Sequence, residues 1–143
     1  MFVPYRDLPG MNGTSGGYVQ FNMNPAGNRT TDCTVRAIAL ATGTDWDETY
    51  IGLCARGFAM KSMPDNDDVW WSYLNRQGFD SHRILSYCPD CMTVAEFCLE
   101  NPEGLFVIAT PGHVLCAIDG DWYDAWDSSD EIVLHYWTKE RKL

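Results

Sequence analysis

The chain has 143 residues, of which 45% are hydrophobic, and this length suits one compact domain over residues 1–143. Its formal net charge of −10 argues against a basic footprint for nucleic acid or an anionic membrane surface. No apolar run approaches the roughly 20 residues that cross a bilayer, and the first residues lack a signal-peptide pattern. We therefore expect a cytoplasmic protein whose six cysteines are reduced.

The first half of the chain predicts an irregular segment followed by helices. Residues 1–30 are rich in Gly, Asn, Thr and Pro, with one short edge strand expected at 18–21. A helix is expected from Cys33 to Ala41, capped by Thr31 or Asp32 and ended by Gly43. Two more helices are expected at 45–57, where Gly57 ends the first of them, and at 66–78.

The second half is mainly strand. Strands are expected at 79–85, 105–110, 114–118, 122–126 and 132–137, with one short helix at 93–100. The last three strands would form a meander. Helices first and strands last predict an α+β fold, with N-terminal helices packed on a C-terminal antiparallel β-sheet.

Cys33 lies in the first turn of a predicted helix, where the positive end of the helix dipole favours the thiolate. His113 leads a predicted strand far downstream, and a hairpin returns from it toward Asp124 and Asp127. A thiolate nucleophile needs a base, and the base needs a group that orients it. The order Cys, His, Asp therefore favours a cysteine nucleophile with a His-Asp support.

The length of the hairpin turn decides which aspartate meets His113. A three-residue turn over 119–121 places His113 opposite Asp127, on the same side of the sheet. A two-residue turn, Asp119-Gly120, places Asp124 diagonally beside His113 and points Asp127 away. We favour Asp127 and keep Asp124 as the alternative.

These residues resemble the papain-like cysteine peptidase superfamily, and its minimal members most closely. An Asp-Cys-x-x-Arg-Ala start at Asp32 and a Gly-His-Val, Asp-Gly and Tyr-Asp-x-Trp-Asp-Ser-Ser ending also look like small proteins of tailed phages. The resemblance covers about residues 28–137. It implies a helix packed on an antiparallel sheet, with the active site in the cleft between them.

The resemblance also implies the role of each residue. Cys33 would be the nucleophile, His113 the general base and acid, and Asp127 the orienting group. Such enzymes usually carry a Gln about six residues before the cysteine as an oxyanion donor, and here Asn28 lies five residues before it. The main-chain N–H of Cys33 would supply a second donor.

The sequence therefore predicts a cysteine hydrolase that cleaves a peptide, isopeptide or related amide bond through a thioester. The alternatives are a transglutaminase-like acyl transferase and a non-catalytic binding or inhibitory protein on the same scaffold. The expected partner is a protein or peptide substrate, including a host protein if the chain is phage-encoded. No cofactor is expected.

A CxxC motif joins Cys88 and Cys91. A structural zinc site needs about four ligands, and no second Cys or His pair has matching spacing, so no metal site is expected. We interpret the two as loop thiols, with a metal or disulfide pair as the alternative.

Overall fold

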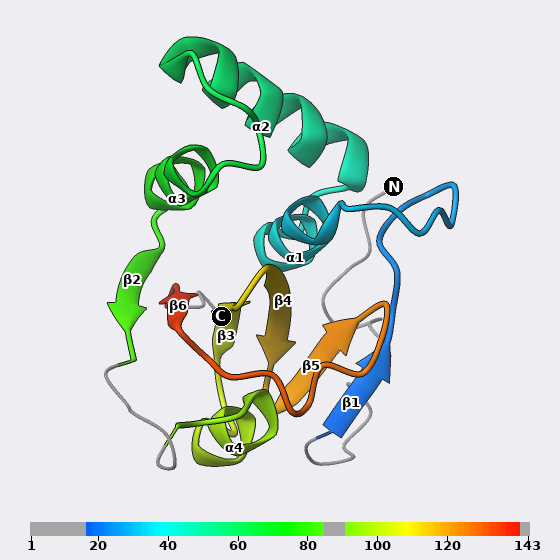
Figure 1. Ribbon diagram of the computed structural model, residues 1–143, viewed down its shortest axis with the longest axis vertical. Coiled ribbons are helices and arrows are strands. Elements are labelled where there is room, and N and C mark those ends of the chain that lie inside the picture. The colour runs from blue at the N-terminus through cyan, green and yellow to red at the C-terminus, as the bar shows by residue number, and fades with distance from the viewer. Residues whose placement is uncertain (1–16, 85–90, 141–143) are drawn as a thin grey trace.

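The computed structural model describes residues 17–84 and 91–140, and within them it contains four helices and one six-stranded sheet (Figure 1). The helices are α1 (Cys33–Thr42), α2 (Trp46–Met60), α3 (Asp67–Arg76) and α4 (Val94–Glu100). The strands are β1 (Gly17–Gln20), β2 (Asp80–Arg83), β3 (Leu105–Thr110), β4 (His113–Ile118), β5 (Asp121–Asp124) and β6 (His135–Thr138). The expected combination of helices with a sheet is confirmed.

The sheet is mixed, with the strand order β1-β5-β4-β3-β6-β2. Its neighbouring strands run antiparallel except β1, which pairs with β5 in parallel. The expected meander is wrong, because β6 pairs with β3, and both β4 and β3 lie between β5 and β6. The segment between β5 and β6 therefore crosses to the other side of the β3–β4 hairpin, and the N-terminal strand takes the edge beside β5.

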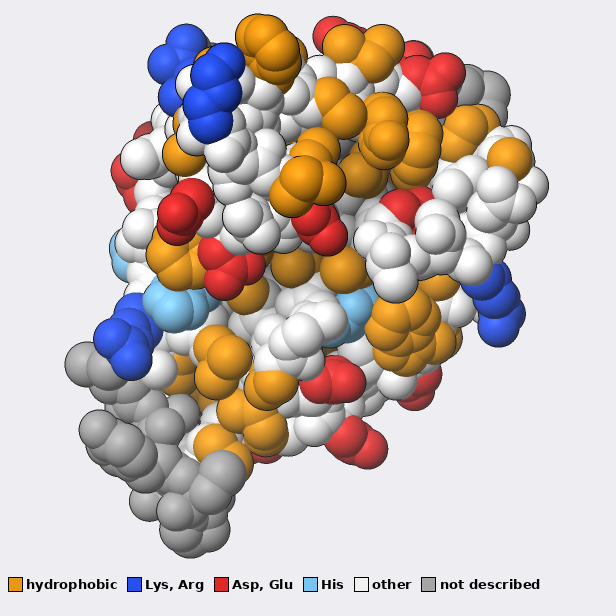
Figure 2. All heavy atoms as spheres, turned by 45° about the horizontal axis from the view of Figure 1, so that its top comes forward, with side chains coloured by type: hydrophobic (Ala, Val, Ile, Leu, Met, Phe, Trp, Pro, Cys, Tyr) orange, Lys and Arg blue, Asp and Glu red, His pale blue; other side chains and the backbone are white. Residues whose placement is uncertain are grey.

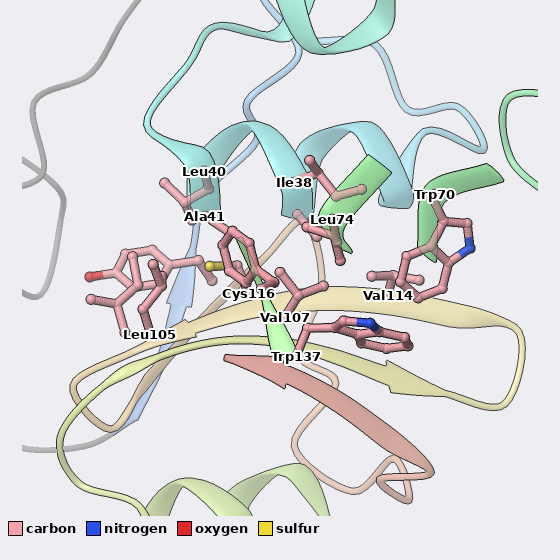
Figure 3. Close-up of a cluster of buried hydrophobic side chains, with 14 of the residues drawn as sticks. Ile38, Leu40, Ala41, Trp70, Leu74, Leu105, Val107, Val114, Cys116 and Trp137 are labelled. Carbon is pink, nitrogen blue, oxygen red and sulfur yellow. The ribbon is translucent and has the colours of Figure 1, made fainter. Parts of the chain in front are cut away.

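Both faces of the central hairpin are covered. Val107 and Cys116 lie in one apolar cluster with side chains from α1 and α3, whereas Ile108 and Leu115 lie in a second cluster with α4. Figure 3 shows the first cluster, in which the helix side chains meet those of the strands. Coverage on both faces explains why residues 105–110 form an apolar run without polar alternation.

Local signals fix the ends of α1 and the start of α2. Gly43 adopts the left-handed conformation at the end of α1, with φ of 70°. Asp45 caps α2, and its Oδ1 accepts a hydrogen bond of 2.7 Å from the Glu48 N–H. The expected end of α2 at Gly57 is wrong. The helix continues to Met60, and Lys61 takes the left-handed position.

Among the described residues, no helix combines the length and the apolar composition needed to cross a bilayer.

Candidate active site

Cys33 is the first residue of α1 and is half-buried. The first main-chain hydrogen bond at this end runs from the Arg36 N–H to the Asp32 carbonyl, at 2.9 Å. The N–H groups of the residues before Arg36 have no acceptor within the helix, so they leave partial positive charge beside the thiol. This end of the helix favours the anionic form of Cys33.

His113 is placed by a tight turn at the end of the β3–β4 hairpin. Thr110 and His113 are paired across the hairpin, so Pro111 and Gly112 alone form the turn. Gly112 has φ of 68°, and a proline followed by a left-handed glycine is the combination that a type II turn requires. His113 is consequently fixed at the end of the sheet, with 6% of its surface exposed.

Asp124 contacts His113 directly. The β4–β5 turn has two residues, Asp119 and Gly120, both with positive φ, as a type I′ turn demands. Because Ile118 then pairs with Asp121, Asp124 lies diagonal to His113 on the same face. His113 Nε2 is 2.6 Å from Asp124 Oδ2. Asp124 is thus the carboxylate at the candidate site.

The preference for Asp127 is wrong. Its side chain is exposed and accepts hydrogen bonds from the hydroxyl and, at 3.0 Å, from the N–H of Ser129. This is the geometry of an aspartate that stabilises its own turn. The three-residue hairpin turn on which the preference rested is not the one that forms.

The Asp124 carboxylate is held on several sides. Its Oδ2 accepts a second hydrogen bond from Ser128 Oγ at 2.7 Å, and its Oδ1 accepts one from the Ala125 N–H at 2.8 Å. Arg36 Nη2 lies 3.7 Å from Oδ1. With 4% of its surface exposed, Asp124 is fixed by donors rather than by water.

The charges of the site favour a thiolate and an imidazolium. Burial raises the pKa of Cys33, but the hydrogen bond and positive charge of His113 outweigh it, so the pKa lies below its ordinary value. Burial likewise lowers the pKa of His113, but hydrogen bonds to Asp124 and Cys33 raise it to about 9. Both shifts favour the form of the pair in which Cys33 is a thiolate and His113 is an imidazolium.

Trp126 covers the pair of His113 and Asp124 from the solvent side. Its ring centroid lies 4.2 Å from that of His113 at an angle of 32°, and the Arg36 guanidinium lies 5.5 Å from its centroid. The indole is 48% exposed. It therefore shields the hydrogen bond from water and presents its outer face to a ligand.

Cys33 and His113 open onto a cleft of about 480 Å³. Trp70 and Trp71 of α3 form part of its apolar wall, and Asp65 lies at its rim. A second hollow of about 400 Å³, which contains Trp46 and Tyr50, shares Thr31, Thr34 and Asp65 with the first. In Figure 2, acidic and apolar side chains meet histidine side chains on this face of the molecule.

Asn28 does not line this cleft. Its side chain is exposed, and its main-chain carbonyl accepts a hydrogen bond of 3.2 Å from Asn22 Nδ2. The role of Asn28 as an oxyanion donor stays a prediction. The N–H of Cys33 at the start of α1 is the donor already close to the thiol.

Other cysteines lie apart from the site. Cys98 and Cys116 are buried, and burial raises the pKa of Cys98 to about 12 and that of Cys116 further. Cys91 of the CxxC motif is disulfide-bonded, so the expectation of six reduced cysteines is wrong, as is the interpretation of Cys91 as a loop thiol. Cys88 of the motif lies outside the described residues. Within residues 17–84 and 91–140, no group of three His, Cys, Asp or Glu side chains could hold a metal ion.

Arg36 and Ser128 were not among the predicted site residues, although both touch Asp124. Arg36 follows Cys33 by three positions, so the two share one side of a helix, and that spacing is a readable signal. Ser128 follows Asp124 by four residues in an irregular segment, and no sequence pattern predicts its position.

Compared with family models, curated proteins and solved structures, the chain shows no significant match. The functional argument therefore rests on the geometry of the site.

Proposed function

We propose that the protein is a cysteine hydrolase of papain-like type that cleaves a peptide, isopeptide or related amide bond. The observation that carries the proposal is the connected series of Cys33, His113 and Asp124. The thiol is hydrogen-bonded to an imidazole whose Nε2 lies 2.6 Å from a buried carboxylate. A nucleophile, a base and an orienting acid in this order are the requirements of thiol acyl transfer.

In the first half of the reaction, the Cys33 thiolate attacks the carbonyl carbon of the amide and a C–S bond forms. The negative charge moves to the carbonyl oxygen, where the N–H of Cys33 is placed to donate a hydrogen bond. The C–N bond then breaks, and the His113 imidazolium gives its proton to the leaving amine. A thioester and a neutral imidazole remain.

In the second half, the His113 imidazole takes a proton from water as the water oxygen attacks the thioester. The C–S bond breaks, the acid is released and the thiolate–imidazolium pair returns. Asp124 holds the imidazole in place through both halves and stabilises its charged form.

The shape of the site supports a polypeptide substrate. The two hollows of about 480 and 400 Å³ share a wall beside Cys33, so a chain can extend to either side of the reacting carbonyl. Trp70 and Trp71 in the first hollow, and Trp46 and Tyr50 in the second, supply apolar contact area. A cytoplasmic location belongs to this proposal: the free thiols at Cys33, Cys54, Cys98 and Cys116 support it, whereas the disulfide bond of Cys91 does not.

The first test is iodoacetamide labelling of the native protein between pH 5 and 9, read by peptide mass spectrometry. We expect Cys33 to react selectively at neutral pH, and we expect His113→Ala to abolish the selectivity. Slow labelling of Cys33, equal with and without His113, would reject the proposal and favour a binding protein on this scaffold.

The second test is turnover. A peptide library incubated with the protein should yield cleaved products that Cys33→Ala fails to produce, while circular dichroism shows that the variant is folded. Addition of a primary amine then separates hydrolysis from acyl transfer, because an acyl transferase would yield the new amide in place of the free acid.

A further inference from the structure

Arg36 is a buried cation between two carboxylates. It is 6% exposed, its Nη1 lies 3.4 Å from Asp32 Oδ1, and its Nη2 lies 3.7 Å from Asp124 Oδ1. A charge buried this deeply is expensive unless opposite charges compensate it. The two carboxylates beside the guanidinium supply this compensation.

Asp32 fixes one side of the guanidinium. The Oδ2 of Asp32 accepts hydrogen bonds from Asn24 Nδ2 at 3.1 Å and from Trp46 Nε1 at 2.9 Å, and only 7% of the residue is exposed. Asn24 and Trp46 hold Asp32 in place, and Arg36 follows Asp32 by one helical turn. The guanidinium therefore stays near Asp124 through the two ion pairs, while its Nη2 has no hydrogen-bond acceptor among the described residues.

The five groups alternate in charge. A thiolate (Cys33), an imidazolium (His113), a carboxylate (Asp124), a guanidinium (Arg36) and a second carboxylate (Asp32) follow one another through the contacts described above. Without the guanidinium, two buried carboxylates would share a region with one imidazolium. Because like charges repel one another, the guanidinium between them favours the arrangement in which Asp124 stays beside His113.

We propose that Arg36 is a positioning residue, whose charge holds the Asp124 carboxylate in place facing His113. The inference rests on the proposed function in one respect, that Cys33 reacts as the partner of His113. One helix then carries both the nucleophile and the cation that fixes the acid, three residues apart.

Other titratable groups also face this part of the site. Tyr18 of β1 donates from its hydroxyl to the main-chain carbonyl of Asp124 at 3.2 Å, and the exposed Asp127 follows β5. Asp65, Asp67 and His135 line the cleft beyond Cys33. These groups are the same in every variant below, so they do not contribute to a difference between variants.

The experiment measures the rate of Cys33 alkylation by iodoacetate against pH. Iodoacetate is an anion that the imidazolium attracts, so its rate falls as the pH rises through the pKa of His113. In Arg36→Met we expect this fall at a pH lower by at least about half a unit, because His113 loses its fixed anionic partner. Arg76→Met, on the exposed last turn of α3, should behave as wild type.

The direction of the shift separates positioning from a simple loss of charge. Removing a nearby cation with Asp124 unmoved would favour the imidazolium and move the fall to higher pH. The proposal would be overturned if, in folded Arg36→Met, the alkylation rate falls at the same pH as in wild type or at a higher pH. Should Arg36→Met not fold, Arg36→Gln is judged by the same criterion, and circular dichroism establishes the fold of each variant.

A double-mutant cycle tests whether Arg36 acts through Asp124. In an Asp124→Asn background, Arg36→Met should leave the pH of the fall nearly unchanged, and an equal shift in both backgrounds would overturn the proposal. The labelling of wild-type protein shows whether only the role of Arg36 is wrong or the proposed function as well. If wild-type Cys33 lacks fast labelling dependent on His113, the proposed function itself is wrong.

Discussion

At the scale of single residues, the Asp124 carboxylate raises the pKa of His113 and so extends the pH range in which the imidazole stays protonated. It accepts hydrogen bonds from the imidazole, from Ser128 and from the Ala125 N–H within a nearly closed pocket. A carboxylate saturated with donors stays ionised and stabilises a neighbouring cation. The reactive state of Cys33 thus depends on a residue that need not touch the substrate.

Replacing Asp124 with Asn should lower the pH at which His113 loses its proton. The pKa of His113 is raised to about 9, with Asp124 among the causes, so removal of this charge lowers it toward the ordinary value. We expect the iodoacetate rate at Cys33 to fall at a lower pH in Asp124→Asn. The matched variant Asp127→Asn should retain the wild-type profile. A shift of equal size in both variants would show that the two carboxylates act only as distant charges.

Cys33 should also differ from the other thiols in a single sample. The pKa of Cys33 lies below its ordinary value, whereas burial raises that of Cys98 to about 12. At pH 7 and brief exposure to iodoacetamide, we expect Cys33 to label at least about a hundredfold faster than Cys98 or Cys116. Peptide mass spectrometry of the native protein measures this ratio, and urea-unfolded protein, in which the rates should become similar, is the control.

At the scale of secondary-structure elements, two hairpin turns set the geometry of the site. The turn at Gly112 fixes where His113 begins β4, and the turn at Gly120 fixes the register that brings Asp124 beside it. Each turn uses a glycine with positive φ. The position of the base and of its acid therefore depends on local backbone conformations that few residues adopt.

Gly112→Ala should impair the site more than it destabilises the fold. The new Cβ would meet no atom within 4 Å, so the cost is backbone strain of about 1 kcal/mol at φ of 68°. Gly27 is a matched control, because it has the same φ and the same open surroundings away from His113. We expect both variants to lose similar stability in urea unfolding, and only Gly112→Ala to slow Cys33 alkylation. Equal rates in the two variants would mean that the turn does not control the position of His113.

The helices could be predicted from the sequence largely because their caps are local. Gly43 and Asp45 occupy the cap positions that their residue types favour. Gly57 misled the prediction because it is also a good stop signal. A Cβ there would come within 2.7 Å of the Ser62 carbonyl, so the glycine is needed for the close approach of the following loop. That contact cannot be read from the spacing of apolar residues.

The strand order and the acid of the site were harder to predict. The pairing of Val107 with Trp137 joins residues far apart in the chain, and nothing in either strand specifies the partner. The segment Asp119-Gly120-Asp121 allows turns of two or three residues, and that single-residue difference exchanges Asp124 for Asp127. Cys33 and His113 could be proposed because each stands at the end of a recognisable element.

At the scale of the whole molecule, a net charge of −10 surrounds a site whose proposed nucleophile is an anion. Asp65 and Asp67 lie on the cleft itself. A negative potential at the entrance favours the approach of cations and disfavours anions, and salt weakens both effects.

Charged thiol reagents should detect this potential. The measurement compares two rates at Cys33, that with a cationic methanethiosulfonate divided by that with an anionic one. We expect Asp65→Asn to lower this ratio by about twofold to fivefold at low salt. The effect should disappear near 1 M salt. Glu100→Gln on α4, exposed beyond the other face of the sheet, is the control and should leave the ratio unchanged. A ratio insensitive to Asp65 would mean that the cleft carboxylates do not influence what reaches the thiol.

Cys33 and His113 stand 80 positions apart in the chain, and this distance bears on when the proposed site can form during synthesis. A ribosome that has released α1 but not yet the β4–β5 hairpin exposes a nascent chain whose Cys33 has neither His113 nor Asp124 beside it. Its thiol then lacks the positive partner that lowers its pKa. Because both partners come from the last third of the chain, the proposed nucleophile gains the groups that activate it only when the sheet is complete.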